Sequence, residues 1–251
     1  MSASIVVDHV SKHFKVAHQQ SLKRLVVNAV RGSKLSRSFT ALEDISFTLE
    51  QGDSIGVMGL NGSGKSTLLK LMSGVMLPDE GNVLTRGRIA GLIEVGAGFH
   101  PDLSGRENVY LSGAILGMSE AEINRKFDAI VDFSEMEKFL DKDVRHYSSG
   151  MFMRLAFAVA IQTDCDIFLM DEMLAVGDQP FKRKCLRRIS ELKAEGHTMV
   201  YVSHSPRQVM RVCDRGLVLR AGKVAFQGSA ADAVKHLGYD IDSDDEDENG
   251  R

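Results

Sequence analysis

The sequence has few cysteines, and none of them is placed for a disulfide framework or a zinc site. Cys165, Cys185 and Cys213 are widely spaced in a chain of 251 residues and form no C-x-x-C pair. This usage favours a reducing compartment such as the cytosol. We therefore expect the three thiols to behave as small, buried apolar side chains.

Long hydrophobic runs are also absent from the sequence. The longest apolar stretches, such as residues 155–161 and 167–170, are well short of the roughly 20 residues that a membrane span requires. The N-terminal residues show no basic segment followed by an apolar one, which is the pattern of an exported protein. We expect a cytoplasmic protein that does not itself cross a bilayer.

The chain has no excess of positive charge. Lys and Arg number 31 against 34 Asp and Glu, which gives a net charge of -3. No global basic field favours nucleic acid, and we expect no nucleic-acid partner. At 43% hydrophobic and 26% charged residues, the chain can bury one large core or two small ones.

Short β-branched runs predict strands, and helical patterns lie between them. Expected strands are 5–7, 45–49, 55–58, 167–170 and 199–202, expected helices are 65–76, 151–162 and 181–195, and a hairpin is expected over 217–226. This order predicts an α/β fold with a covered, mostly parallel sheet. Two S-x-x-E capping boxes, at Ser119 with Glu122 and at Ser134 with Glu137, mark a helical lobe between the strand groups.

The most specific motif is Gly59-Leu-Asn-Gly-Ser-Gly-Lys-Ser66, which fits G-x-x-x-x-G-K-S/T between a predicted strand and a predicted helix. Its glycines let successive backbone amides face phosphate oxygens at a helix N-terminus. Lys65 supplies a positive charge to the β- and γ-phosphates, and Ser66 offers a hydroxyl to Mg²⁺. The predicted nucleotide contacts are Gly59, Asn61, Gly62, Ser63, Gly64, Lys65, Ser66 and Thr67.

Two acids follow the apolar strand 167–170, at the strand end where ligands gather in a parallel sheet. Asp171 is placed to hold the Mg²⁺ shell, and Glu172 is placed to polarise a water that attacks the γ-phosphate. His204 closes the strand 199–203, where its imidazole can reach a terminal phosphate. Together with Lys65, these residues predict a nucleotide triphosphatase but do not say of which kind.

Three further features resemble one family over nearly the whole chain. Tyr147-Ser-Ser-Gly-Met151, Leu174-Ala-Val-Gly-Asp178 and His204 are similar to the signature sequence, D-loop and switch histidine of ABC ATPases. The family signature is usually LSGGQ, of which this chain keeps Ser148 and Gly150. The resemblance implies a head-to-tail homodimer in which Ser148, Gly150 and Asp178 help to complete an ATP site that one chain cannot form alone.

The resemblance has further implications for fold and site. It implies an antiparallel β subdomain beside the P-loop core, an ATPase domain over residues 1–239 and a helical lobe at roughly 98–160. Glu94 stands where the family commonly has a glutamine that links Mg²⁺ to the permease. Phe14 stands where the family stacks an aromatic ring on adenine, although an aromatic side chain at this place is nearly as consistent with a core residue.

The subgroup that the chain resembles is the ATPase of polysaccharide exporters, which move O-antigen, capsule, teichoic acid or galactan chains built on lipid carriers. YSSGM, DEMLAVGD and Gly96-Ala-Gly-Phe-His-Pro-Asp-Leu-Ser-Gly-Arg-Glu-Asn108 carry this resemblance. It implies an integral membrane permease as partner, lipid-linked polysaccharide handled through that permease, and a peripheral place on the cytoplasmic face of the inner membrane. A soluble ABC ATPase without a permease and an importer ATPase are the alternatives.

Two segments lie outside this scheme. Leu22 to Val30 has helical apolar spacing behind Ser21, with basic residues through Arg37, and fits a solvated surface helix as well as a membrane or permease contact. The acidic run 240–251 cannot bury a core, so we expect a disordered, solubilising tail.

Overall fold

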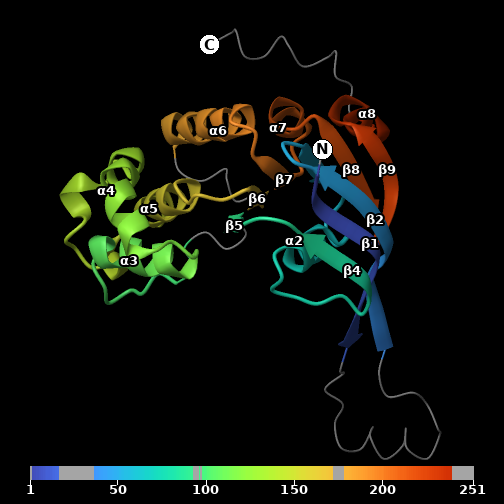
Figure 1. Cartoon of the computed structure of the whole chain (residues 1–251), viewed down its shortest axis with the longest axis horizontal. Coiled ribbons are helices and arrows are strands. Elements are labelled where there is room, and N and C mark those ends of the chain that lie inside the picture. Colours follow the sequence, from blue (N-terminus) through green and yellow to red (C-terminus); the bar gives the residue numbers. More distant parts are fainter. Residues whose placement is uncertain (1, 17–36, 93–95, 97, 172–177, 239–251) are drawn as a thin grey trace, which may run out of the picture.

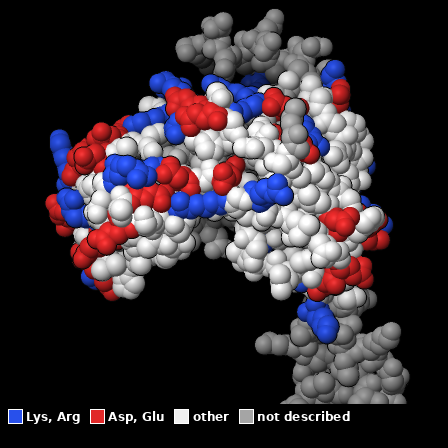
Figure 2. Space-filling view, viewed as in Figure 1, with Lys and Arg blue, Asp and Glu red and all other residues white. Residues whose placement is uncertain are grey.

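The computed structural model describes residues 2–16, 37–92, 96, 98–171 and 178–238. It contains a six-stranded sheet, a three-stranded sheet and a group of helices at one side of them (Figure 1). The expected basic helix after Ser21, the acidic tail 240–251 and the predicted site residues Glu94 and Glu172 lie outside the described residues. Within the described part, no helix is both long enough and apolar enough to span a membrane. On the face drawn in Figure 2, Lys and Arg side chains are interspersed with Asp and Glu side chains.

The larger sheet has the strand order β5-β6-β7-β3-β8-β9. Its strands are β3 (Ser54–Met58), β5 (Ile89–Leu92), β6 (Ile167–Met170), β7 (Thr198–Val202), β8 (Arg215–Arg220) and β9 (Lys223–Ser229). The first five run parallel, and β9 returns antiparallel to β8. Every residue of β3, β6 and β7 is buried, as expected for a parallel sheet that is covered on both faces. The α/β prediction with a mostly parallel sheet is confirmed.

Each face of this sheet has its own hydrophobic cluster. On one face, Ile55, Leu169 and Val200 pack with α2 (Lys65–Met72) and with the smaller sheet. On the other face, Phe168 and Tyr201 pack with three helices and with part of a fourth. The three helices are α6 (Gln179–Ala194), α7 (Pro206–Val212) and α8 (Ala230–His236).

The smaller sheet is antiparallel with the order β2-β1-β4, as the family resemblance implies. Its strands are β1 (Ala3–Val16), β2 (Arg37–Glu50) and β4 (Glu80–Thr85). β1 and β2 are much longer than the runs 5–7 and 45–49 that the sequence pattern predicts. Their register shifts near His9 and Asp44, both with left-handed backbones, and these irregularities break the two-residue alternation that would reveal a strand.

Three helices and two short 3-10 turns form a lobe beside the larger sheet (Figure 1). The elements are α3 (Gly105–Ile115), α4 (Glu120–Ser134), η1 (Glu137–Phe139), η2 (Val144–His146) and α5 (Ser149–Ile161). They surround a hydrophobic cluster of their own, which includes Val109, Ile130 and Leu155. α5 also reaches the central cluster through Phe157 and Ile161, so this helix connects the lobe to the sheet.

Several boundaries differ from the sequence-based expectation. The helix expected over 65–76 ends at Met72, because the chain turns through Gly74 with a left-handed φ of 75°. The capping box at Ser134 is wrong: Ser134 lies in the last turn of α4, and its hydroxyl donates to the Val131 carbonyl at 2.8 Å. A complete capping box instead starts α3, where Ser104 pairs with Glu107.

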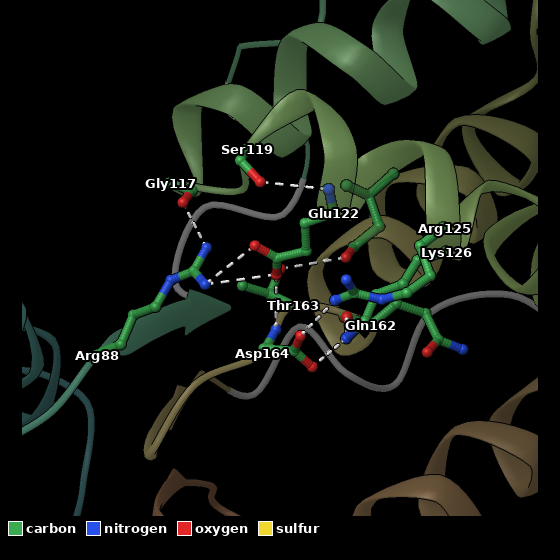
Figure 3. Close-up of polar contacts among 10 residues, drawn as sticks. Arg88, Gly117, Ser119, Glu122, Arg125, Lys126, Gln162, Thr163 and Asp164 are labelled. Carbon is green, nitrogen blue, oxygen red and sulfur yellow. Dashed lines mark hydrogen bonds and ion pairs between the residues drawn. The ribbon is translucent and has the colours of Figure 1, made fainter.

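Ser119 does cap α4 by accepting from the Glu122 amide at 3.2 Å, but the Glu122 carboxylate turns away from it (Figure 3). That carboxylate accepts from the Arg88 guanidinium at 3.2 and 3.3 Å and from the Asp164 amide at 3.3 Å. Arg88 also donates to the Gly117 carbonyl. Because Arg88 immediately precedes β5, this cluster, which we call the Arg88 joint, ties the lobe to the larger sheet.

Candidate functional site

The glycine-rich loop between β3 and α2 requires glycine at two positions for steric reasons. Gly59 and Gly64 have φ angles of 144° and 107°, which side chains rarely adopt. A Cβ on Gly59 would lie 2.2 Å from the Leu219 carbonyl oxygen, and one on Gly64 would lie 2.6 Å from the Ala41 carbonyl oxygen. The loop is therefore clamped between β8 and β2, which fixes its amides at the start of α2.

A pocket of about 270 Å³ opens over this loop. It brings together a cation, two hydroxyls and a carboxylate from distant parts of the sequence: Lys65, Ser66 and Thr67 at the start of α2, and Asp171 after β6. The remaining lining residues are Phe39, Ala41, Asn61, Gly62, Gly64 and Val202. Six of the eight predicted P-loop positions thus line the same pocket as Asp171, whereas Gly59 and Ser63 are not in its lining.

Lys65 and Asp171 affect each other electrostatically. Burial lowers the pKa of Lys65, and the Asp171 charge opposes that shift. Burial likewise raises the pKa of Asp171, and the Lys65 and Lys70 charges oppose it. Lys65 donates to the Gly59 and Leu60 carbonyls at 2.8 and 3.0 Å. Its ammonium group is thus held at the loop by neutral acceptors, beside the space that a phosphate would enter.

The donor set fits a phosphate ligand that carries a hard metal ion. Lys65 and the loop amides suit phosphate oxygens, and the Ser66 hydroxyl with the Asp171 carboxylate suits Mg²⁺. Ser63 adds a buried hydroxyl that has no hydrogen-bond partner among the described residues. Within the ranges that the structure describes, no cluster of three or more His, Cys, Asp or Glu side chains could hold a metal ion.

The aromatic residue in the pocket lining is Phe39. Phe14, which the resemblance proposes for the adenine, is its cross-strand partner in the β1–β2 register and is not part of the lining. Phe39 is 52% exposed and Phe14 is 36% exposed. Phe39 was not predicted as a site residue, because the sequence pattern does not indicate a strand over residues 37–44. An exposed aromatic facing a P-loop is a signal that only the β1–β2 register reveals.

The signature residues lie in the lobe rather than in the pocket. Ser148 caps α5 by accepting from the Met151 amide at 3.2 Å. A Cβ on Gly150 would meet nothing closer than 3.9 Å, so the surface at this helix start is open. Neither residue lines the P-loop pocket. A single chain therefore keeps its signature apart from its own P-loop.

Of the two other predicted residues, Asp178 lies at the start of a helix and His204 lies just after a strand. Asp178 caps α6 and accepts from the Phe181 amide at 3.3 Å. His204 is exposed and follows β7, whose last residue, Val202, lines the pocket. The structure thus places His204 at the pocket edge of the sheet.

Comparisons with known proteins agree with this geometry. Residues 42–175 match the model of the ABC transporter family. The chain is 48% identical over 198 residues to the ABC transporter protein AbcA of Aeromonas salmonicida, covering 79% of this chain and 64% of that protein. It is 42% identical to the O-antigen export system ATP-binding protein RfbB of Klebsiella pneumoniae, covering 92% and 95%. With the teichoic acids export ATP-binding protein TagH of Listeria innocua it shares 38% identity, covering 92% and 68%.

Solved structures share the fold at lower identity. One described as the ATP binding subunit of an ABC transporter superposes with a TM-score of 0.74 at 24% identity and covers 93% of both chains. A dimeric ATP-binding cassette bound to ADP and Pi gives a TM-score of 0.72 at 22% identity and covers 90% of this chain and 98% of that one. With its P-loop pocket, its two sheets and its helical lobe, the chain belongs to the ABC transporter family, among the ABC-type ATPases.

Proposed function

We propose that the chain is the ATP-hydrolysing subunit of a transporter that exports a lipid-linked polysaccharide through a separate membrane permease. The observation that carries the ATPase part is the single pocket that joins Lys65, Ser66 and Asp171. The names of the relatives, which are O-antigen and teichoic acids export ATP-binding proteins, support the cargo class. Such a subunit works on the cytoplasmic face of the inner membrane.

In this proposal the loop amides and Lys65 bind the phosphates of ATP, and Phe39, with Phe14 beside it, offers a ring face to the base. Ser66 and Asp171 would hold Mg²⁺, which supplies positive charge to the β- and γ-phosphates. Glu172 orients the attacking water as general base, and His204 contacts the terminal phosphate. Glu94 would sense the site on behalf of the permease.

The separation of signature and P-loop supports a homodimer. Ser148 offers a hydroxyl and Gly150 an open helix start, and both suit the γ-phosphate of an ATP bound by a second copy of the chain. Two ATP molecules then bridge the copies, and hydrolysis releases them. A shift from a mostly open to a mostly closed dimer requires about 5.5 kcal/mol of differential binding.

The decisive experiment measures the ATPase rate against protein concentration for the wild type, Glu172→Gln and the control Glu120→Gln, an exposed acid on α4. The wild type and the control are expected to show a rate that rises faster than linearly, while Glu172→Gln loses activity and elutes as a dimer with MgATP. A rate strictly proportional to concentration, from a monomer that stays active without Glu172, would discard the shared site.

The cargo requires a separate test in cells. Removal of the chain should leave lipid-linked polysaccharide on the inner side of the membrane, and Lys65→Ala should fail to restore export. Unchanged surface polysaccharide in cells that have lost the chain would refute export and favour one of the two alternatives, an importer or a permease-free ATPase.

A further inference from the structure

One arginine of the lobe makes ionic contacts in two directions. Arg154 lies on α5, six residues after Ser148. Its Nη1 donates to Glu135 Oε2 at 2.8 Å, and its Nη2 donates to Asp178 Oδ1 at 2.7 Å. The side chain is 20% exposed, and its guanidinium carbon lies 4.9 Å from the centre of the Phe181 ring. Ion pairs and ring packing together fix the orientation of this guanidinium.

Glu135 shows that the contact constrains the backbone. It ends α4 with φ 59° and ψ 36°, a left-handed conformation that favours glycine or asparagine. Its carboxylate accepts from Arg154 and, at 2.9 Å, from Lys184 of α6. A non-glycine residue stays in this conformation when its surroundings hold it there. The end of α4 is thus fixed to both α5 and α6.

Asp178 connects the same arginine to the nucleotide site. It caps α6 and is the first described residue after Asp171, which lines the P-loop pocket seven positions earlier. Because Arg154 holds the Asp178 carboxylate, it fixes the N-terminal end of α6. The same helix, α5, begins at the signature residues Ser148 and Gly150.

We propose that Arg154 is a positioning residue that holds Asp178 at a fixed place relative to α5, the helix that begins at the signature residues. The inference rests on the proposed function, because it matters only if the P-loop of one copy works with the signature of another. Glu135, Asp178 and Phe181, which Arg154 contacts within the described part of the chain, do not line the pocket, so Arg154 acts on the alignment of groups during hydrolysis rather than on ATP binding. Misplacement of reacting groups by about 1 Å can cost about a hundredfold in rate.

The conservative variant Arg154→Lys separates positioning from charge. Lysine keeps the positive charge, but its single ammonium group does not reproduce the planar fork that donates to Glu135 and Asp178 from opposite ends. Arg188→Lys is the matched control: Arg188 lies on α6 with a side chain 24% exposed and pairs with Glu195 at 2.8 Å. Glu135→Gln is a second test variant that leaves the Asp178 contact in place.

The experiment compares kcat, KM for MgATP, the dissociation constant for a fluorescent ATP analogue and the melting temperature of these variants with the wild type. Arg154→Lys is expected to lower kcat about tenfold or more and to change the dissociation constant less than about twofold. Its melting temperature should equal that of Arg188→Lys. The decrease in kcat should be smaller for Glu135→Gln than for Arg154→Lys. These results would establish positioning.

Two results would overturn the inference. The first is a kcat for Arg154→Lys that equals the kcat of Arg188→Lys. The second is a decrease in kcat that is fully accounted for by weaker ATP binding or by a lower melting temperature. Lys65→Ala keeps this failure distinct from failure of the proposed function. If Lys65→Ala abolishes hydrolysis while Arg154→Lys is normal, only the inference fails; if Lys65→Ala stays active, the proposed ATPase site itself is wrong.

Discussion

The Arg88 joint predicts a specific loss of stability when its acid is neutralised. In Glu122→Gln, an NH₂ group that donates hydrogen bonds replaces one carboxylate oxygen. The neighbouring groups, the Arg88 guanidinium and the Asp164 amide, are donors as well, so the new NH₂ group faces donors instead of acceptors. The side chain of Glu122 is 11% exposed and that of Arg88 is 34% exposed. The substitution therefore leaves a partly buried guanidinium without its counter-charge.

The magnitude lies between two limits. Exposed ion pairs contribute about 0 to 1 kcal/mol, and breaking a fully buried pair costs about 3 to 5 kcal/mol. Because Arg88 is one-third exposed and its bonds are 3.2 and 3.3 Å long, we expect a loss of about 2 kcal/mol in the free energy of unfolding. For a domain of this size, that loss lowers Tm by about 4 to 8 °C.

Glu120→Gln is the matched control for this measurement. Both acids lie in the first turn of α4 and so share the interaction with the helix dipole, which is worth about 0.3 to 1 kcal/mol. Urea unfolding of the two variants and the wild type isolates the contribution of Arg88. If Glu122→Gln loses no more stability than Glu120→Gln, the joint does not stabilise the fold and the reasoning is wrong.

Three further predictions concern the core and the pocket. Burial raises the pKa of Cys165, Cys185 and Cys213 to about 12, so a thiol reagent at pH 8 should label none of these thiols before denaturation and all three after it. The same pKa shift makes the free energy of unfolding fall as the pH rises above the unfolded thiol pKa of about 8.5. Rapid native labelling would contradict this. Phe39→Ala should weaken the binding of ATP and of GTP alike by about tenfold, since stacking contributes about 1 to 3 kcal/mol per base. Unchanged affinities in a nucleotide titration would show that Phe39 does not contact the base. Gly64→Ala should abolish ATP binding in the same titration, because its Cβ would lie 2.6 Å from a backbone oxygen at a φ of 107°; normal affinity would show that the loop tolerates a side chain.

The elements that could be predicted best from the sequence are those whose structure is determined by neighbouring residues. The strands β3 and β6 are buried along their whole length and therefore appear as continuous apolar runs. The P-loop is a contiguous motif whose glycines are required by its own backbone angles. In both cases neighbouring residues contain nearly all the information, so the sequence could place Lys65 and Asp171 at the same end of the sheet, where both line the pocket.

The features that the sequence analysis missed depend on tertiary contacts. Phe39 reaches the pocket only because β2 pairs with β1 along its full length. Glu122 matched a capping box, yet its carboxylate pairs with Arg88, 34 positions away. Glu135 ends a helix without glycine because Arg154 and Lys184 hold it. No local pattern encodes such partners.

The position of α5 limits how the lobe can move during a catalytic cycle. Leu155 and Val159 pack in the lobe cluster, while Phe157 and Ile161 pack in the central cluster. Exposing one such side chain costs about 1.5 to 3 kcal/mol, so exposing Phe157 and Ile161 together would cost about 3 to 6 kcal/mol. That cost is comparable with the whole differential binding of about 5.5 kcal/mol that dimer closure requires. Closure that brings Ser148 toward a second copy is therefore favoured when it keeps α5 packed on both sides, so that the lobe and the sheet move together.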